Sequence, residues 1–183
     1  SPEDIEFGFD SFVNEAICSK STGSISYSVQ SGESVTVDAD TGKITTLKAG
    51  TSTIKAVLTE DDNYQESVIT YQITVKNAAD SGFGFEDPNP VNRKYVKNDT
   101  YSNIASGGSG TGKVTYSITS GNAATIDKNT GELTINKAGT VEVTATREAD
   151  DKYAEISVSY SLTIEKAEQD DFGFDVLSPE NQF

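Results

Sequence analysis

Histidine, methionine and tryptophan are absent from this 183-residue chain, and cysteine occurs once, at Cys18. A single cysteine cannot form an internal disulfide. Without a histidine to activate it, we interpret Cys18 as a small strand or loop residue rather than a nucleophile. No apolar run approaches the ~20 residues of a membrane helix, so membrane insertion is not expected. The sequence also shows no signal-like start and no anchor, which indicates a piece of a longer protein.

Basic residues are scarce. The chain has 14 Lys and Arg against 29 Asp and Glu, which gives a net charge of −15. Such a surface repels phosphate backbones, so nucleic-acid binding is not expected. The charge would attract cations, or it would simply keep an extracellular protein soluble. Abundant Val, Ile, Thr, Ser and Tyr favour pleated sheets over helices.

One stretch of the sequence occurs twice. Residues 27–78 return 89 positions later with no gap, and the matching segments are Tyr27–Val29 with Tyr116–Ile118, Asp40–Gly42 with Asn129–Gly131, Lys48–Thr51 with Lys137–Thr140, and Asp61–Tyr64 with Asp150–Tyr153. A fixed period of this length indicates tandem copies of one small domain. We therefore predict a first repeat over residues 1–80, a second over 81–171, and the start of an incomplete third repeat or a linker over 172–183.

The tripeptide Phe-Gly-Phe occurs three times, at residues 7–9, 83–85 and 172–174. Apolar residues alternate from Asp4 to Asp10, which predicts a first strand with Ile5, Phe7 and Phe9 on one face. The first two tripeptides are 76 positions apart and the last two 89. The first repeat is therefore expected to lack 13 residues just after its first strand. The extra segment of the second repeat, 86–100, is then a loop with a short edge strand around Tyr95–Val96.

The rest of the second repeat reads as short strands separated by turn residues, with no helical pattern. The expected strands are 101–105, 114–118, 124–126, 133–135, 140–146 and 156–164. In the last strand we expect Tyr160, Leu162 and Ile164 to be buried and Thr163 to face outward. In its first-repeat counterpart, Tyr71, Ile73 and Val75 should be buried, and Thr74 should face outward. Many short strands with regular turns are typical of an antiparallel β-sandwich.

The run from Val37 to Ala56 contains Thr41-Gly42-Lys43-Ile44 and Lys48-Ala49-Gly50-Thr51, and its counterpart runs from Ile126 to Ala145. These runs resemble the bacterial immunoglobulin-like repeat. The resemblance implies an all-β chain of two tandem immunoglobulin-like antiparallel β-sandwiches arranged end to end. Few residues separate the last strand of the first repeat from Phe83, so we also expect a short, extended linker over 77–82. Such domains stack in large surface adhesins and other cell-envelope proteins as spacers. The resemblance therefore implies an extracellular location at a bacterial cell surface, with neighbouring repeats of the same chain as partners.

Acidic loops are the chemically suggestive feature of the sequence. If the strands follow immunoglobulin order, the acidic residues Asp80, Asp127, Glu148, Asp150 and Asp151 gather at the end of the second repeat that faces the first. Ca²⁺ takes six to eight oxygen ligands, so Asp80, Glu148, Asp150 and Asp151 are our candidate calcium site. The alternative is that they are solvated turn formers, with Asp127 and Asp150 bonding nearby backbone N–H groups. No other cofactor is indicated.

Three smaller features stay open. Tyr64 and Tyr153 are either a sugar-binding surface or loop tyrosines folded over the end of the core. Lys, Asn and Asp residues could form an isopeptide cross-link, for which the spacing gives no support. Asn98-Asp99-Thr100 fits a glycosylation sequon. The sequence favours a non-enzymatic extender module of a bacterial surface or secreted adhesin. The alternative is a module that binds a glycan or a host protein, with 86–100 as the first place to look for a binding surface.

Overall fold

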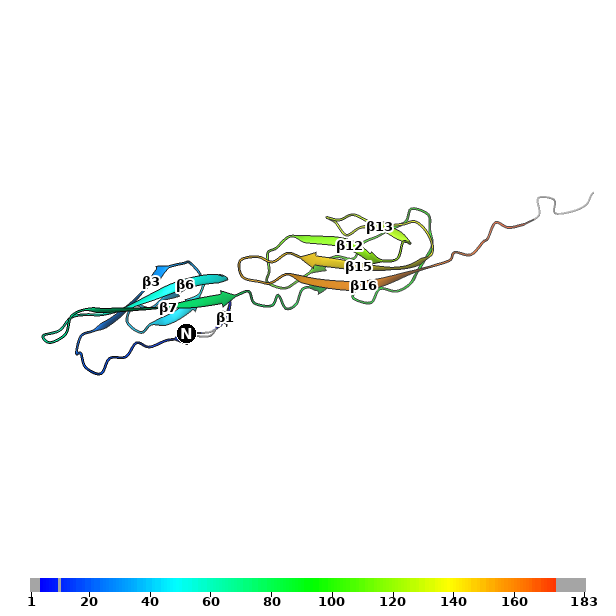
Figure 1. The fold of residues 1–183 in the computed structure, drawn as a ribbon. Helices are drawn as coiled ribbons and strands as arrows, with labels where there is room; N and C mark the ends of the chain where they lie inside the picture. Colours follow the sequence, from blue (N-terminus) through cyan, green and yellow to red (C-terminus); the bar gives the residue numbers. More distant parts are fainter. Residues whose placement is uncertain (1–3, 10, 174–183) are drawn as a thin grey trace, which may run out of the picture. The chain divides into compact units, whose positions relative to one another are not determined.

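The computed structural model describes residues 4–9 and 11–173, and all of its regular elements are β-strands. No helix occurs within those residues, so none there could cross a membrane. The strands of the first repeat are β1 (Ile5–Glu6), β2 (Phe12–Val13), β3 (Ile25–Ser31), β4 (Val35–Val37), β5 (Lys43–Thr46), β6 (Gly50–Leu58) and β7 (Ser67–Lys76). Those that follow are β8 (Gly84–Phe85), β9 (Arg93–Lys94), β10 (Thr100–Tyr101), β11 (Ala105–Ser106), β12 (Val114–Ser120), β13 (Ala124–Ile126), β14 (Leu133–Ile135), β15 (Gly139–Arg147) and β16 (Ile156–Glu165) (Figure 1). The all-β prediction is confirmed.

Both repeats have the same sheet topology. In the first repeat, a four-stranded sheet of order β1-β7-β6-β3 accompanies a three-stranded sheet of order β2-β5-β4. In the second repeat the corresponding orders are β9-β16-β15-β12 and β10-β14-β13. Each repeat is therefore an immunoglobulin-like pair of sheets, as the period-two strands predict. The second repeat has one further pair, β8 with β11.

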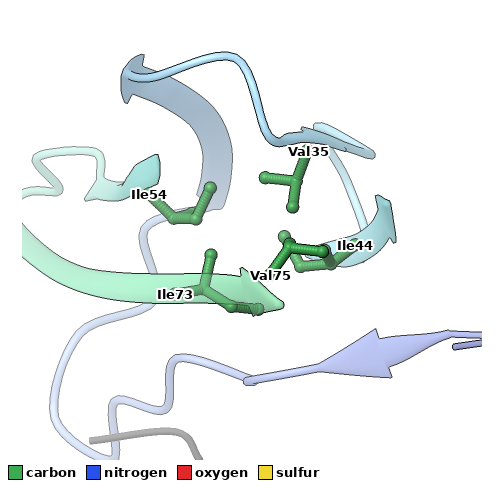
Figure 2. Close-up of a cluster of buried hydrophobic side chains, with 5 residues drawn as sticks. All are labelled: Val35, Ile44, Ile54, Ile73 and Val75. Carbon is green, nitrogen blue, oxygen red and sulfur yellow. The ribbon is translucent and has the colours of Figure 1, made fainter. Parts of the chain in front are cut away.

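The core of the first repeat lies between its two sheets. Val35 and Ile44 come from the three-stranded sheet, and Ile54, Ile73 and Val75 come from β6 and β7 of the other (Figure 2). Successive side chains of a strand point to opposite faces, so the alternation in sequence becomes two apolar faces that pack together.

The last strand of each repeat has the predicted faces. Ile73 and Val75 of β7 are buried, and so are Tyr160, Leu162 and Ile164 of β16, while Tyr71 is half-buried. The outward threonines pair across strands. Thr74 and Thr51 bring their hydroxyl oxygens within 3.1 Å, and Thr163 and Thr140 do the same at 3.1 Å.

The sheets depart from a purely antiparallel arrangement at one edge. β1 pairs with β7 in parallel, with Ile5 opposite Val75, and β9 pairs with β16 in parallel, with Arg93 opposite Ile164. Each sandwich therefore departs from the predicted antiparallel arrangement at this edge strand.

The pairing of the edge strands also corrects the alignment of the repeat starts. The N–H of Phe7 donates to the carbonyl of Lys76 at 2.8 Å, and the N–H of Tyr95 donates to the matching carbonyl of Glu165 at 2.8 Å. Phe7 thus corresponds to Tyr95 and not to Phe83. The first repeat therefore lacks one residue after its first strand, and not 13, because Ile5 matches Arg93 and Phe12 matches Tyr101. The later part of 86–100 belongs to the shared framework. Within the described residues, the elements particular to the second repeat are β8 and its partner β11.

The predicted strand over Asp4–Asp10 is shorter than expected. β1 ends at Glu6, because Gly8 has a φ of +83°, a backbone conformation that turns the chain and suits glycine. As a result Phe9 is 54% exposed and lies outside the strand, so the prediction that it shares a strand face with Ile5 and Phe7 is wrong. The predicted strand over 101–105 is likewise divided, into β10 and β11.

The described chain forms two compact units. Unit 1 contains the described residues of Ser1–Gly84 together with Ala105–Val114 and Thr146–Val158; unit 2 contains those of Phe85–Ile104, Thr115–Ala145 and Ser159–Phe183. Two loops of the second repeat therefore belong to unit 1. The division into independent repeats at residues 80 and 81 stays a prediction, and the expected third repeat lies outside the described residues from Phe174 onward.

Candidate functional site

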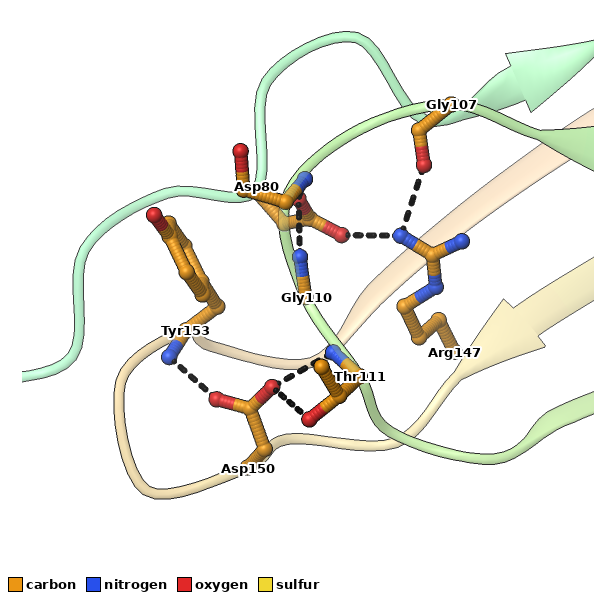
Figure 3. Close-up of polar contacts among 8 residues, drawn as sticks. Asp80, Gly107, Gly110, Thr111, Arg147, Asp150 and Tyr153 are labelled. Carbon is orange, nitrogen blue, oxygen red and sulfur yellow. Dashed lines mark hydrogen bonds and ion pairs between the residues drawn. The ribbon is translucent and has the colours of Figure 1, made fainter.

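The carboxylate of Asp80 is buried and hydrogen-bonded within unit 1. Its Oδ1 accepts the N–H groups of Ser109 at 2.6 Å and Gly110 at 2.9 Å, and its Oδ2 accepts Nη1 of Arg147 at 2.8 Å (Figure 3). The side chain of Asp80 is fully buried and that of Arg147 is 11% exposed. A buried charge of this kind is tolerated only when it is paired and hydrogen-bonded.

Arg147 makes this pairing possible from the end of β15. Val141, Val143 and Ala145 point into the core, and Arg147 is the next residue on the same face. Its Nη1 also donates to the carbonyl of Gly107 at 2.8 Å, and its guanidinium carbon lies 4.2 Å from the ring centroid of Phe83. Arg147 therefore joins the linker residue Asp80, the 107–112 loop and Phe83.

Backbone donors stabilise the charged form of Asp80. The N–H of Gly110 contributes most to lowering the pKa of this carboxyl group, and the N–H of Ser109 and the Arg147 guanidinium add to it, against the opposing effect of burial. Asp80 is therefore held as an anion.

Asp150 fixes the loop between β15 and β16 through hydrogen bonds. Its Oδ2 accepts the N–H of Thr111 at 2.6 Å and the Thr111 hydroxyl at 2.9 Å, while its Oδ1 accepts the N–H groups of Lys152 at 2.8 Å and Tyr153 at 2.7 Å (Figure 3). These donors, Thr111 first, lower the pKa of Asp150. In the first repeat, Asp61 accepts the equivalent N–H groups of Thr22, Asn63 and Tyr64. This geometry is that of the turn-forming alternative.

The four predicted calcium ligands do not converge. Asp80 and Asp150 bind adjacent stretches of one loop, through Ser109 and Gly110 in one case and Thr111 in the other. Glu148 and Asp151 are exposed. Within the described residues, no group of three or more acidic, cysteine or histidine side chains is arranged to hold a metal ion. As placed, N–H groups and a guanidinium surround the buried carboxylate, which is the opposite of an oxygen-lined cation site.

Calcium binding at Asp80, Glu148, Asp150 and Asp151 stays a prediction with a direct test. A ligand that binds only the folded state raises its stability, by about 2.7 kcal/mol at one hundred times Kd. Millimolar calcium should then raise the melting temperature and EDTA should lower it, while magnesium should do much less. Sodium chloride at matched ionic strength is the control for charge screening. A melting curve that calcium leaves unchanged, or that sodium reproduces, would leave these residues as turn formers.

Arg147 and the glycine-rich 107–112 loop are parts of this cluster that were not predicted from the sequence. One signal for Arg147 was present: it continues the inward-facing alternation of β15 and therefore needs a buried partner. The partner itself could not be read from the sequence, because Asp80 is 67 positions away.

Tyr153 contacts residues of the first repeat inside unit 1. Its ring meets that of Phe7 edge to face, with centroids 5.7 Å apart, and Phe7 packs against the core of the first repeat. This geometry is that of a loop tyrosine folded over the end of a core. Its counterpart Tyr64 is 47% exposed.

Comparison with known proteins agrees with this architecture. Residues 96–158 match the family model described as the bacterial Ig-like domain, group 2. This match confirms the resemblance to bacterial immunoglobulin-like repeats. No curated protein matches the chain in sequence.

Among solved structures, the chain is similar to Drosophila N-cadherin EC1-4, with 14% identity and a TM-score of 0.40 over 80% of this chain and 42% of that one. It is similar to human protocadherin-24 EC1-2, with 15% identity and a TM-score of 0.36 over 80% and 83%. A C-terminal intimin fragment, crystallised with the intimin-binding domain of the translocated intimin receptor, gives 16% identity and a TM-score of 0.37 over 78% and 52%. The chain thus spans about half or less of the N-cadherin and intimin chains, and these likenesses carry no information on activity or partners.

Proposed function

We propose that this chain is a non-enzymatic extender module of an exported bacterial surface protein, in which each bacterial Ig-like repeat docks on the one before it. The observation that carries the proposal is the set of contacts made inside unit 1 by the loop between β15 and β16. This loop belongs to the second repeat in sequence, and its partners belong to the first.

Most of these contacts use backbone groups. The N–H of Ala49 donates to the carbonyl of Asp151 at 2.7 Å, and Nδ2 of Asn77 donates to the carbonyl of Asp150 at 2.8 Å. The N–H of Ala154 donates to the carbonyl of Ala78 at 2.9 Å. Backbone hydrogen bonds depend little on side-chain identity, so the same docking can recur at every junction of a tandem array.

Tyr64 extends this argument to a preceding repeat. Tyr64 occupies in the first repeat the position that Tyr153 has in the second. In the loop between β6 and β7 its N–H donates to Asp61, as the N–H of Tyr153 donates to Asp150. A tyrosine that is half exposed in one copy and covered in the other is what a stacking contact at every junction predicts. Neighbouring repeats are therefore the proposed partners, and resistance to bending at the junction is the proposed mechanism.

Nitrogen-15 relaxation measured on the whole chain tests this function. We expect the amides of both repeats to share one set of rotational correlation times, since a docked junction makes the repeats tumble together. Replacing Tyr153 with alanine should separate the two sets, because it removes the ring contact with Phe7. The matched control is Tyr64→Ala, which removes the corresponding exposed ring. Independent tumbling of the unmodified repeats would overturn the proposal.

A further inference from the structure

One edge of β16 is covered at its end and open before it. β9 pairs with this edge at Ile164 and Glu165, and the N–H of Tyr95 donates to the carbonyl of Glu165 at 2.8 Å. The backbone groups of successive residues point alternately to the two edges of a strand, so those of Ser159 and Ser161 point to the same edge as those of Glu165. The N–H and C=O groups of these two serines are therefore directed away from β15, towards the open part of the edge.

The register of β16 against β15 supports this direction. The hydroxyl oxygens of Thr163 and Thr140 lie 3.1 Å apart, and those of Ser159 and Thr144 lie 2.8 Å apart. The two pairs are separated by the same number of residues on both strands, so no bulge between them changes the direction of the backbone groups. Side chains approach closely in this way at pairs whose backbone groups face away from each other.

A polar groove of ≈ 370 Å³ lies beside this edge. It is lined by residues 88–90, Glu142 of β15 and residues 159–161 of β16, all of which belong to unit 2. In the register given above, Glu142 lies opposite Ser161, on the outward face of the sheet. We call this hollow the β16 groove.

The segment 88–90 forms a fixed wall of the β16 groove. Its two prolines have no N–H to offer the strand, and the N–H of Asn89 donates to Oδ1 of Asp87 at 3.0 Å. The amide of Asn103, 5% exposed, accepts the N–H of Asp87 at 3.1 Å and donates to its carbonyl at 2.7 Å. Within the described residues, no backbone hydrogen bond joins this wall to β16. The wall is therefore held in place without pairing the strand beside it.

We propose that the β16 groove binds an extended peptide segment of a partner protein, which adds to the open edge as a strand and places a lysine or arginine near Glu142. The backbone groups of Ser159 and Ser161 are two residues apart, about 6.8 Å in a strand, which is the repeat of an extended chain. An open edge of this kind is a template for strand addition, in which main-chain hydrogen bonds supply the affinity.

Charge favours a basic segment. Glu142 is the charged residue among those that line the β16 groove, and the chain as a whole has a net charge of −15. Ser161 stands between Glu142 and the open edge, and its side chain is short enough for a lysine or arginine of the added strand to reach across it. The net charge also attracts a cationic segment over a distance.

A saccharide fits the β16 groove less well than a peptide. Small-molecule sites are usually lined by apolar and aromatic side chains. The aromatic residue of this groove is Tyr160, which is 3% exposed and packs its ring edge to face against Phe85 at 4.6 Å. Its ring is therefore part of the core and presents no face on which a sugar could stack.

A chemical-shift titration of the whole chain tests the proposal, with a capped pentapeptide of alternating valine and lysine as the probe. We expect the amide signals of Ser159 and Ser161 to shift as the peptide is added. The same peptide with N-methylated backbone should bind about tenfold more weakly or worse, because it keeps the charge and loses main-chain hydrogen bonds. Glu142→Gln should weaken binding about twofold to fivefold, and more at low salt. Glu132→Gln, which neutralises an exposed carboxylate outside the groove, is the matched control.

Ser161→Pro gives a second readout. Proline is tolerated in a strand where the N–H faces an open edge, so this variant should keep its β-structure by circular dichroism and lose affinity for the peptide. Unchanged amide signals of Ser159 and Ser161 at millimolar peptide would overturn the proposal and leave the prolines as a guard of the edge. Equal binding of the N-methylated peptide would also overturn it. Shifts caused by maltotriose and not by the peptide would assign the groove to a neutral sugar instead.

Discussion

Replacing Asp80 or Arg147 alone with a neutral residue should lower the free energy of unfolding by about 3–5 kcal/mol, because either change leaves one charge buried without its partner. The expected loss is large because the Asp80 side chain is fully buried and its oxygens accept three donors. Urea denaturation of Asp80→Ala and Arg147→Leu, followed by circular dichroism, measures it. Asp151→Ala is the matched control, since that carboxylate is exposed.

The double variant Asp80→Ala/Arg147→Leu separates pairing from packing. Leucine occupies the Arg147 position in the first repeat, as Leu58, so the fold accommodates it. With both charges removed, the loss should be smaller than the sum of the single losses, since no buried charge stays unpaired. Strict additivity of the two single losses would contradict a direct interaction.

The dependence on pH offers an independent check of the same pair. The folded state lowers the pKa of Asp80, so its contribution to stability is present above the ordinary aspartate value of about 3.9 and is lost as the pH falls through the folded-state pKa. The difference in stability between the unmodified chain and Asp80→Ala should therefore shrink as the pH drops below about 4. A difference that stays constant over that range would argue that packing, and not the charge, is responsible.

Local pattern allowed the fold to be predicted over most of each repeat. β13 and β14 have the expected limits, and β16 extends one residue beyond its prediction, because strict alternation and turn residues are properties of neighbouring residues. The predicted match of the first strand was wrong because it relied on local sequence alone. Matching Phe7 to Phe83 relied on an identical tripeptide, whereas hydrogen bonding to β7 and β16 places Phe7 with Tyr95.

The candidate site was less predictable, because its contacts join residues far apart in sequence. Loop order alone predicted that Asp80 and Asp150 lie at one end of the second repeat, and both accept hydrogen bonds from the 107–112 loop. Loop order could not predict which groups of the loop face the two carboxylates. The loop presents N–H groups to the carboxylates, and Arg147 supplies the cation, so these acidic residues are bonded by the protein itself.

Replacing Leu162 with alanine should lower the free energy of unfolding by about 2–5 kcal/mol, since the change removes buried methyl groups and leaves a cavity. Leu162 is fully buried in the middle of β16, the strand on which the faces were most firmly predicted. Its neighbour Ser161 lies on the exposed side of the same strand, so Ser161→Ala is the matched control and should change stability little.

The equivalent change in the first repeat distinguishes the effect of burial from that of position. Ile73 corresponds to Leu162 and is 1% exposed, so Ile73→Ala should cost a similar amount. Amide hydrogen exchange should show where each loss acts, with Leu162→Ala releasing amides of β12, β15 and β16 first and Ile73→Ala those of β3, β6 and β7. A loss below about 0.5 kcal/mol for Leu162→Ala would place that side chain on the wrong face, and with it the register of the strand.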